Sequence, residues 1–311
     1  GMVGMGSIFE EMGKTLTPSP LFATGVLGAS LISLGGNDSQ KQTLLPKIVE
    51  GSLTTALALE ENNRHSPNVI STSATKSGDN YEISGEKTFV IDGHSANLLI
   101  VAARTEGSID DESGITLFML DPKTDGLEIT KTSMVDSRNS AQVKLRNVVV
   151  SSSDILGGLN NGSGILENVL DRAQIAISAE MLGNASQAFQ ITLEYIKERK
   201  QFGAVIGTFQ ALQHRAAEMY SEIELTKSSV IAACNAVDEN SNDLKRMASL
   251  AKFKAGETNH LVTNEAIQMH GGVGVTDEYD VGLYLKRARV TEQIFGNSEY
   301  HIDRYATLSD Y

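Results

Sequence analysis

The first 51 residues carry apolar side chains at helical spacing, interrupted by residues that end helices. Leu27, Leu31 and Leu34 follow one another at intervals of three and four, the period of one helix face. Proline and glycine break this pattern at Pro18, Pro20, Gly35, Gly36 and Pro46. The pattern predicts short helices joined by tight turns.

A further helix is expected after residues 37–39, because Asn37, Asp38 and Ser39 are all residue types that cap helix amino-termini. This helix should run toward Ile48. Pro46 near its end fits poorly, because proline lacks the backbone N–H that a helix interior uses.

Between residues 53 and 156 the pattern changes to short apolar and β-branched runs. Turn-forming residues at 78–80, 92–93 and 124–126 separate several of them. We expect strands at 53–59, 69–74, 81–84, 87–91, 98–103, 115–120, 127–130 and 142–150. Because no helical crossovers separate these runs, they predict a small antiparallel barrel or sandwich rather than a doubly wound nucleotide fold.

Beyond Ser163 the helical period returns and continues almost to the end of the chain. One long helix is expected from about residue 163 to residue 196, a second over 209–237 and a third over 244–269. Long antiparallel helices of this kind form a bundle. The predicted fold is therefore mixed α and β: a partial N-terminal helical domain (1–52), a central antiparallel β-barrel or sandwich domain (53–156) and a C-terminal four-helix-bundle domain (157–311).

Composition and charge narrow the choice of partners. The chain has 311 residues and a formal net charge of −13, which argues against nucleic acid, since such binding uses clustered Lys and Arg. Cys234 is the single cysteine, so no disulfide and no cysteine-based zinc cage is expected, and a cytoplasmic location fits best. No membrane insertion is expected, because the apolar runs are far shorter than a spanning helix. No metal site is expected either. Gly1-Met2 looks like a tag-cleavage remnant before a start residue.

The stretch from Arg199 to Gly203, followed by residues 209–214, could carry chemistry. A basic residue at a helix end, a glycine turn and amides opening the next helix could hold a pyrophosphate through charge-assisted bonds and helix-terminal N–H groups. The alternative is an ordinary helix C-terminus with solvated polar residues.

A second stretch, residues 268–276, places glycines after a helix. They do not match the dinucleotide fingerprint, which needs a strand before the glycine loop. They could be a helix stop, or they could let the backbone approach a flat or phosphorylated ligand. His270, like His94 and His214, is interpreted as a structural histidine.

Together these segments resemble the acyl-CoA dehydrogenase family. The family's Arg-x-Gln-Phe-Gly, Phe-Gln-x-x-Gln-His and Gln-Met-His-Gly-Gly-x-Gly segments match residues 199–203, 209–214 and 268–274, in that order. Gly85-Glu86-Lys87 and Asp92-Gly93 also look like the family's β domain. The resemblance extends from about Ile8 to Arg304, and relative to the family about two amino-terminal helices are expected to be missing.

The resemblance implies a flavoprotein that binds FAD between its β domain and its bundle, with a neighbouring subunit completing the site. Arg199, Gln201 and Phe202 would contact a partner's FAD, and Phe89 would supply an aromatic wall. The family pattern places three further residues near the adenine end, namely Gln268, Gly271 and Gly272. It also implies an acyl-CoA substrate, an electron-transfer flavoprotein as partner, and a homodimer, homotetramer or heterotetramer.

Family enzymes remove an α-proton and a β-hydride, and the proton needs a base that this sequence lacks. The two positions where members carry a glutamate hold Phe295 and Ala173 here. Asp171 is interpreted as a helix-surface charge because two residues along a helix point about 200° apart. Neither Glu292 nor Glu299, which flank the final turn, is assigned as catalytic.

Other departures suggest a specialised branch. The family's flavin-binding loop aligns with residues 59–66, which have gained bulk and charge, and Arg64 could replace lost backbone donors. Ile91 stands where a threonine hydroxyl would meet the flavin. These features resemble the branch with unlike subunits, such as pimeloyl-CoA and steroid side-chain dehydrogenases. The alternatives are a non-catalytic structural subunit and a flavin-dependent oxygenase relative.

Overall fold

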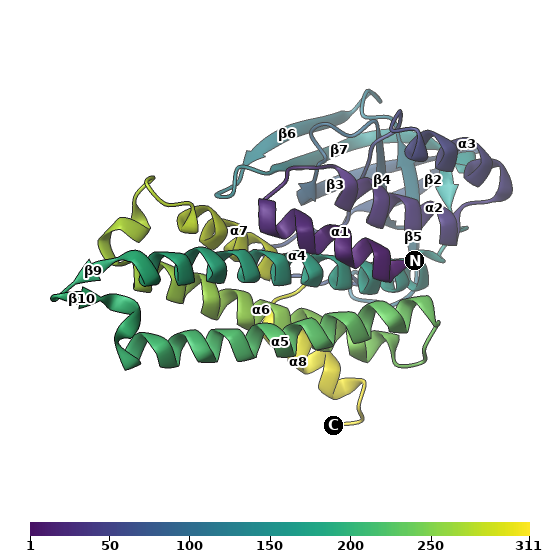
Figure 1. The fold of residues 1–311 in the computed structure, drawn as a ribbon. Helices are drawn as coiled ribbons and strands as arrows, with labels where there is room; N and C mark the ends of the chain where they lie inside the picture. The colour runs from purple at the N-terminus through teal and green to yellow at the C-terminus, as the bar shows by residue number, and fades with distance from the viewer. The chain divides into compact units, whose positions relative to one another are not determined.

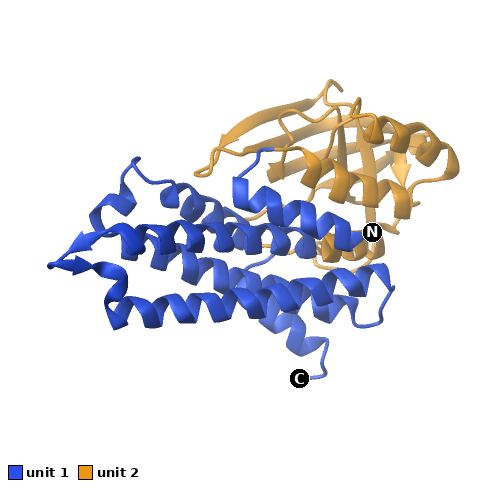
Figure 2. Ribbon diagram, in the orientation of Figure 1, with its two compact units in different colours: residues 1–18, 174–311 blue, residues 19–173 orange.

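The computed structural model describes residues 1–311, which form two compact units. One unit contains residues 1–18 and 174–311, and the other contains residues 19–173 (Figure 2). The three sequence-based domains, 1–52, 53–156 and 157–311, divide the chain by element type rather than by compactness. They therefore stay a prediction.

The unit of residues 19–173 begins with the predicted short helices. A π-helical segment, η1 (Phe22–Gly28), continues into α2 (Ala29–Gly35), which is followed by α3 (Asp38–Val49). Asn37 and Gln40 form a reciprocal capping box at the start of α3. Pro46 is accommodated inside α3. The caps therefore decided where this helix begins, as the sequence predicted.

The same unit contains one eight-stranded sheet. Its strand order is β6-β7-β3-β2-β4-β5-β8, with β1 paired in parallel to β4, and most other pairs are antiparallel. The strands are β1 (Thr55–Ala58), β2 (Ser73–Ser77), β3 (Asn80–Ile91), β4 (Leu98–Arg104), β5 (Ile115–Leu120), β6 (Leu127–Ser133), β7 (Asn139–Ser151) and β8 (Ile155–Leu156), with the 3₁₀ turn η2 (Ser152–Asp154) before the last. This confirms the central β domain, although no barrel closes.

Strand β3 differs from the sequence prediction, because residues 81–84 and 87–91 belong to a single strand. The register against β7 shifts between Ile83 and Gly85 and again between Lys87 and Val90. These two irregularities interrupt the alternation of buried and exposed positions without ending the strand.

The other unit is helical. Its long helices are α4 (Gly162–Glu198, of which residues 174–198 lie in this unit), α5 (Gln210–Asp238) and α6 (Leu244–His270), and they lie side by side in Figure 1. Shorter elements are α1 (Met2–Thr15), the hairpin β9 (Lys200–Gln201) and β10 (Ala204–Val205), η3 (Ile206–Thr208), η4 (Gly271–Val275), α7 (Val281–Gln293) and α8 (Ser298–Thr307). The predicted helical C-terminal domain is confirmed, and with it the mixed fold class.

Helix α1 approaches α4 so closely that only glycine fits at two positions. A Cβ on Gly13 would lie 2.1 Å from the Glu180 carbonyl oxygen, and a Cβ on Gly183 would lie 1.9 Å from the Glu10 carbonyl oxygen. Tyr284 adds a hydrogen bond from its hydroxyl to the Lys14 carbonyl (2.7 Å). The first helix therefore belongs to the same packed unit as α4 and α7.

No helix of the chain is long and apolar enough to cross a membrane.

Candidate functional site

Three of the predicted site residues lie in the β9–β10 hairpin or directly before it. Gln201 pairs with Ala204, and the turn between them uses positive φ angles at Phe202 (57°) and Gly203 (77°). The Phe202 ring is 91% exposed. Arg199, just before the hairpin, is exposed and makes no hydrogen bond or ion pair through its side chain. The hairpin therefore presents an unpaired guanidinium and an aromatic ring to the solvent, a combination suited to an anionic, planar ligand.

The end of α6 carries the other three predicted residues of this unit. Gly271 ends the helix with φ 64°, and its N–H bonds to the carbonyls of Gln268 and Ile267. A Cβ at Gly271 or Gly272 would meet no atom within 4 Å, so the backbone there is open to a ligand. Gln268 is exposed beside it.

Both groups of residues lie at the same end of the bundle. Tyr195, in the last turn of α4, stacks on His270 with ring centroids 4.2 Å apart, and its hydroxyl donates to the His270 carbonyl (3.3 Å). The Arg199 N–H in turn bonds to the Tyr195 carbonyl (2.9 Å). The structure thus joins Arg199 and the Gly271 turn through two aromatic side chains.

His270 is a structural residue with one notable atom. Burial lowers the pKa of His270, an effect that the hydrogen bond between Nδ1 and the Ala266 carbonyl (2.7 Å) partly offsets. The ring is therefore neutral at pH 7, with the proton on Nδ1. Its Nε2 is buried and has no partner. Sequence reasoning missed this lone acceptor, because its burial depends on Tyr195 and Tyr279, which lie far from it in the sequence.

Phe89 belongs to the unit of residues 19–173 and is described there. It lies within the second register shift of β3, between Lys87 and Val90, has φ 50° and is 43% exposed. The strained backbone turns the ring away from the sheet core. An exposed aromatic ring at this point fits the predicted role of a wall for a planar ligand.

The loop that aligns with the flavin-binding segment lies next to this part of β3. Lys87 Nζ donates to Glu61 Oε1 (2.7 Å) and to the Leu59 carbonyl (3.1 Å), and the Thr88 N–H donates to the Glu60 carbonyl (2.8 Å). Arg64 is exposed at the tip of the loop. The sequence suggested extra charge here, but it did not show that Glu61 and Lys87 form a buried ion pair.

This pair keeps both charges over a wide pH range. Burial alone would raise the pKa of Glu61, but the charge and hydrogen bond of Lys87, with further hydrogen bonds from Ser71 and Thr72, outweigh it and lower the pKa to about 2. Burial lowers the pKa of Lys87 to about 8, although the charge of Glu61 opposes this. Between these values the pair is ionised.

The turn after α7 is one of the two positions where the resemblance to the acyl-CoA dehydrogenase family implies a base. Phe295 (φ 53°, 7% exposed) stands there as a buried apolar residue. Its carbonyl accepts hydrogen bonds from Gln174 Nε2 (3.3 Å) and, with that nitrogen protonated, from His301 Nε2 (3.0 Å). Lys252 Nζ donates to the carbonyls of Gly296 (2.7 Å) and Glu292 (3.1 Å). Buried side chains from α4, α6 and α8 therefore hold this turn, and none of them supplies a carboxylate.

Asp171 corrects one expectation. The sequence placed it on the helix surface, but it is 1% exposed. Nearly every residue of α4 from Val169 to Ala185 is buried, so a rotation of two residues does not bring a side chain to solvent there.

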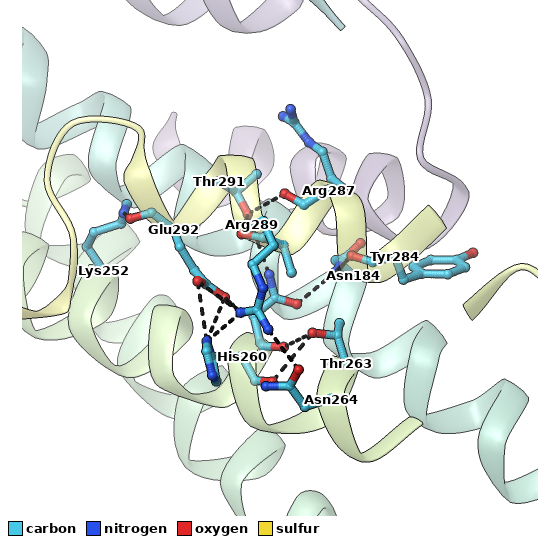
Figure 3. Close-up of polar contacts among 12 residues, drawn as sticks. Asn184, Lys252, His260, Thr263, Asn264, Tyr284, Arg287, Arg289, Thr291 and Glu292 are labelled. Atoms are coloured by element: carbon cyan, nitrogen blue, oxygen red, sulfur yellow. Dashed lines mark hydrogen bonds and ion pairs between the residues drawn. The ribbon is translucent and has the colours of Figure 1, made fainter. Parts of the chain in front are cut away.

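Glu292 lies in a charged cluster on α6 and α7, and Figure 3 shows its contacts. Arg289 Nη1 lies 3.2 and 3.3 Å from the two carboxylate oxygens of Glu292 and 2.5 Å from His260 Nδ1. His260 Nδ1 also lies 3.4 Å from Glu292 Oε2, so this ring nitrogen contacts both the guanidinium and the carboxylate. Glu299 is exposed in the first turn of α8.

Comparison with known families gives two consecutive matches. The profile of the acyl-CoA dehydrogenase middle domain matches residues 56–148, and that of the acyl-CoA dehydrogenase C-terminal domain matches residues 160–307.

Individual relatives agree with these matches. The probable acyl-CoA dehydrogenase YngJ of Bacillus subtilis is 36% identical over 93% of this chain and 78% of its own length. Caffeyl-CoA reductase-Etf complex subunit CarC of Acetobacterium woodii is 30% identical over 95% of this chain and 76% of its own length. A solved steroid ACAD variant, Tcur3481-Tcur3483, is 31% identical with a TM-score of 0.88, covering 100% of this chain and 81% of that one.

Proposed function

Because this chain belongs to the acyl-CoA dehydrogenase family, we propose that it takes part in the α,β-dehydrogenation of an acyl-CoA thioester as one subunit of an assembly of related chains. It is an acyl-CoA dehydrogenase-like oxidoreductase, and its cofactor is FAD. The acyl group and the composition of the assembly are parts of the proposal. A cytoplasmic location is also a proposal, resting on the single Cys234.

The residues at the end of the bundle fit FAD. The guanidinium of Arg199 is exposed and unpaired, and a guanidinium donates two aligned, charge-assisted hydrogen bonds to a diphosphate. The open backbone at Gly271 and Gly272 gives a flat ring system room to approach. The unpaired arginine, at the same end of the bundle as the open glycines, is the observation that carries the proposal. Gln201, Phe202, Gln268 and Phe89 are the other proposed contacts.

The chain's own residues would hold FAD rather than move the α-proton. When bound, FAD accepts the β-hydride of the acyl group. Phe295 cannot accept a proton, and Ala173 has no group that could. The base would therefore come from a related subunit, an arrangement that the relatedness to the Tcur3481-Tcur3483 steroid ACAD supports.

An electron-transfer flavoprotein is the proposed electron partner. CarC, one of the relatives, is a subunit of a reductase-Etf complex. Arg199, just before the β9–β10 hairpin, would contact a neighbouring protomer's FAD, so isolated protomers should hold FAD poorly.

A visible absorbance spectrum of the purified protein tests the proposal. We expect the yellow band of oxidised flavin, no bleaching when an acyl-CoA is added anaerobically, and bleaching once a copurifying dehydrogenase-like chain is present. A homo-oligomer that bleaches alone would overturn the two-subunit arrangement. Single substitutions Asp171→Asn, Glu292→Gln and Glu299→Gln would then identify its base.

A structural subunit without catalysis is the second candidate, favoured by the absence of a carboxylate at Phe295 and at Ala173. Colourless protein that binds no added FAD would support it. Oxygen consumption with a substrate that is not a CoA thioester would instead indicate a flavin-dependent oxygenase.

A further inference from the structure

The loop between β1 and β2, residues 59–72, is closed by a single carboxylate. Glu61, near its start, accepts hydrogen bonds from the backbone N–H groups of Ser71 (2.7 Å) and Thr72 (2.9 Å), near its end. The Ser71 hydroxyl also donates to Glu61. A compact loop whose ends meet in this way has a defined shape that it keeps only while the closing bonds are intact.

The same carboxylate fastens the loop to the sheet. Lys87 on β3 donates to Glu61 and to the Leu59 carbonyl, and its side chain is 0% exposed. The Thr88 N–H donates a hydrogen bond to the Glu60 carbonyl. Because solvent does not reach Lys87, its bonds to the loop are not exchanged for bonds to water. Lys87 therefore holds the start of the loop directly and the end of the loop through Glu61.

The tip of the closed loop points a charge outward. Asn62, Asn63 and Arg64 are exposed, whereas His65, next in sequence, is fixed by a 2.5 Å contact between its Nδ1 and Glu60 Oε1. The side chain of His65 is 3% exposed. Arg64 thus stands on a loop that is anchored on both sides of it.

Thr72 adds a second reason why the loop has one shape. A Cβ on Gly85 of β3 would lie 2.4 Å from the Thr72 hydroxyl oxygen and 2.7 Å from its Cα, so the loop end packs directly on the bare strand backbone. Thr72 at the loop end bonds to Glu61, and Glu61 bonds to Lys87. Displacement of one of these three residues would therefore displace the others.

We propose that Glu61 and Lys87 are positioning residues that latch the loop 59–72 in the shape that presents Arg64 to the diphosphate of FAD. This rests on the proposed function, because it takes FAD as the ligand. Arg64 is the contact, and the buried pair acts through it. The positive charge of Arg64 would replace the backbone N–H donors that the corresponding loop of the family offers. For this the loop must hold Arg64 in one position.

Hydrogen–deuterium exchange and FAD titration of the full chain test the latch. Lys87→Met and Glu61→Gln should each speed amide exchange in residues 59–72 at least tenfold and raise the FAD dissociation constant at least tenfold. The double variant should bind FAD no more weakly than the weaker-binding of the two single variants, because either substitution removes the same ion pair. The matched control is the exposed pair Lys144–Glu86, 3.5 Å apart on the same sheet, where Lys144→Met and Glu86→Gln should change neither quantity.

The salt dependence of FAD binding separates a latch from a general loss of stability. Arg64→Gln should raise the dissociation constant at least tenfold and flatten its dependence on ionic strength, with loop exchange unchanged. Folded Lys87→Met should show the same flattened dependence of the FAD dissociation constant on ionic strength, because its loop no longer presents Arg64. If Lys87→Met does not fold, Arg64→Gln still decides whether the loop contacts the ligand.

Three outcomes would overturn the proposal. They are parental exchange rates for the loop in folded Lys87→Met, an FAD dissociation constant within twofold of the parent in that variant, or an unchanged constant in Arg64→Gln. A parent protein that takes up no FAD would instead overturn the proposed function, and with it the ligand assigned to the loop.

Discussion

The side-chain amide of Gln174 donates a hydrogen bond to the backbone carbonyl of Phe295 over 3.3 Å. Gln174 follows Ala173, so this bond connects the two stretches of sequence where related enzymes carry their base. The bond is buried, and the Gln174 oxygen lies 3.4 Å from Arg304 Nη1. The turn at Phe295 is therefore held in place although it carries no reactive group of its own.

Gly296 cannot take a side chain in this turn. It has φ 104°, and a Cβ there would lie 2.4 Å from Tyr300 Cδ1 and 2.9 Å from His301 Nε2. Gly296→Ala should lower the free energy of unfolding by about 3 kcal/mol, from backbone strain and displacement of His301. Gly158→Ala is the control, because Gly158 has φ 90° but open space around it, and should cost about 1 kcal/mol. Equal losses in urea titrations would show that the neighbours yield freely.

Arg199→Gln should weaken FAD binding without changing stability. A hydrogen bond to a charged group contributes about 1.5–3 kcal/mol, so the dissociation constant should rise roughly tenfold to a hundredfold. Because Arg199 is exposed and unpaired, the midpoint of thermal unfolding without FAD should not move. Lys227→Gln, at an exposed position on α5, is the control for the lost charge. Parental affinity in Arg199→Gln would remove this residue from the site.

Lys252 should make stability rise with pH above neutrality. Burial lowers the pKa of Lys252 from 10.5 to about 7, only partly opposed by the charge of Glu292. Below pH 7 both folded and unfolded chains hold the proton, whereas between pH 7 and 10.5 the unfolded chain holds it more. The free energy of unfolding should therefore rise in this window by up to about 1.4 kcal/mol per pH unit.

Chemical denaturation of Lys252→Met across the same window checks this. In this variant the free energy of unfolding should rise less steeply with pH than in the parent, because the contribution of Lys252 is absent. Lys254→Met, on the same helix but partly exposed and paired with Glu222, should keep the parental slope. A parental slope in Lys252→Met would show that Lys252 titrates as an ordinary lysine.

Protonation of Glu61 in acid should lower the stability of the protein. Its pKa is about 2 in the folded chain and 4.5 as the ordinary value, so its contribution is complete above pH 4.5 and is lost as pH falls toward 2. The loss should be about 3 kcal/mol. Glu61→Gln should show a correspondingly smaller decline in the free energy of unfolding between pH 4.5 and 2. Glu86→Gln, on the exposed end of a neighbouring pair, should decline as the parent does.

The sequence predicted most of the fold because the fold follows local patterns. Apolar spacing located α4, α5 and α6 to within a residue or two, and Asn37 with its neighbours located the start of α3. It divided β3 in two because the irregularity at Gly85 mimics a strand end. Bulges change periodicity without breaking the chain of hydrogen bonds, so a sequence pattern does not distinguish them from turns.

The candidate site was predicted less fully, since buried charges depend on partners far along the chain. Arg199 and the glycines after α6 could be found as motifs, but the pair formed by Glu61 and Lys87 could not. One signal was present: Tyr81, Ile83 and Lys87 stand two and four residues apart in β3, and all three are buried. A lysine on the inward side of a strand needs an acidic partner, which could have directed attention to Glu61.

The division of the chain into units has a consequence for synthesis. Residues 19–173 are contiguous, so the ribosome releases everything that the sheet-containing unit needs before it makes most of the helical one. Helix α1 precedes this unit in the chain and is synthesised before Glu180 and Gly183, so its glycine contact cannot form until those residues have been made. Until then the face of α1 that carries Met2 and Phe9, which is buried in the folded chain, has no surface to pack on.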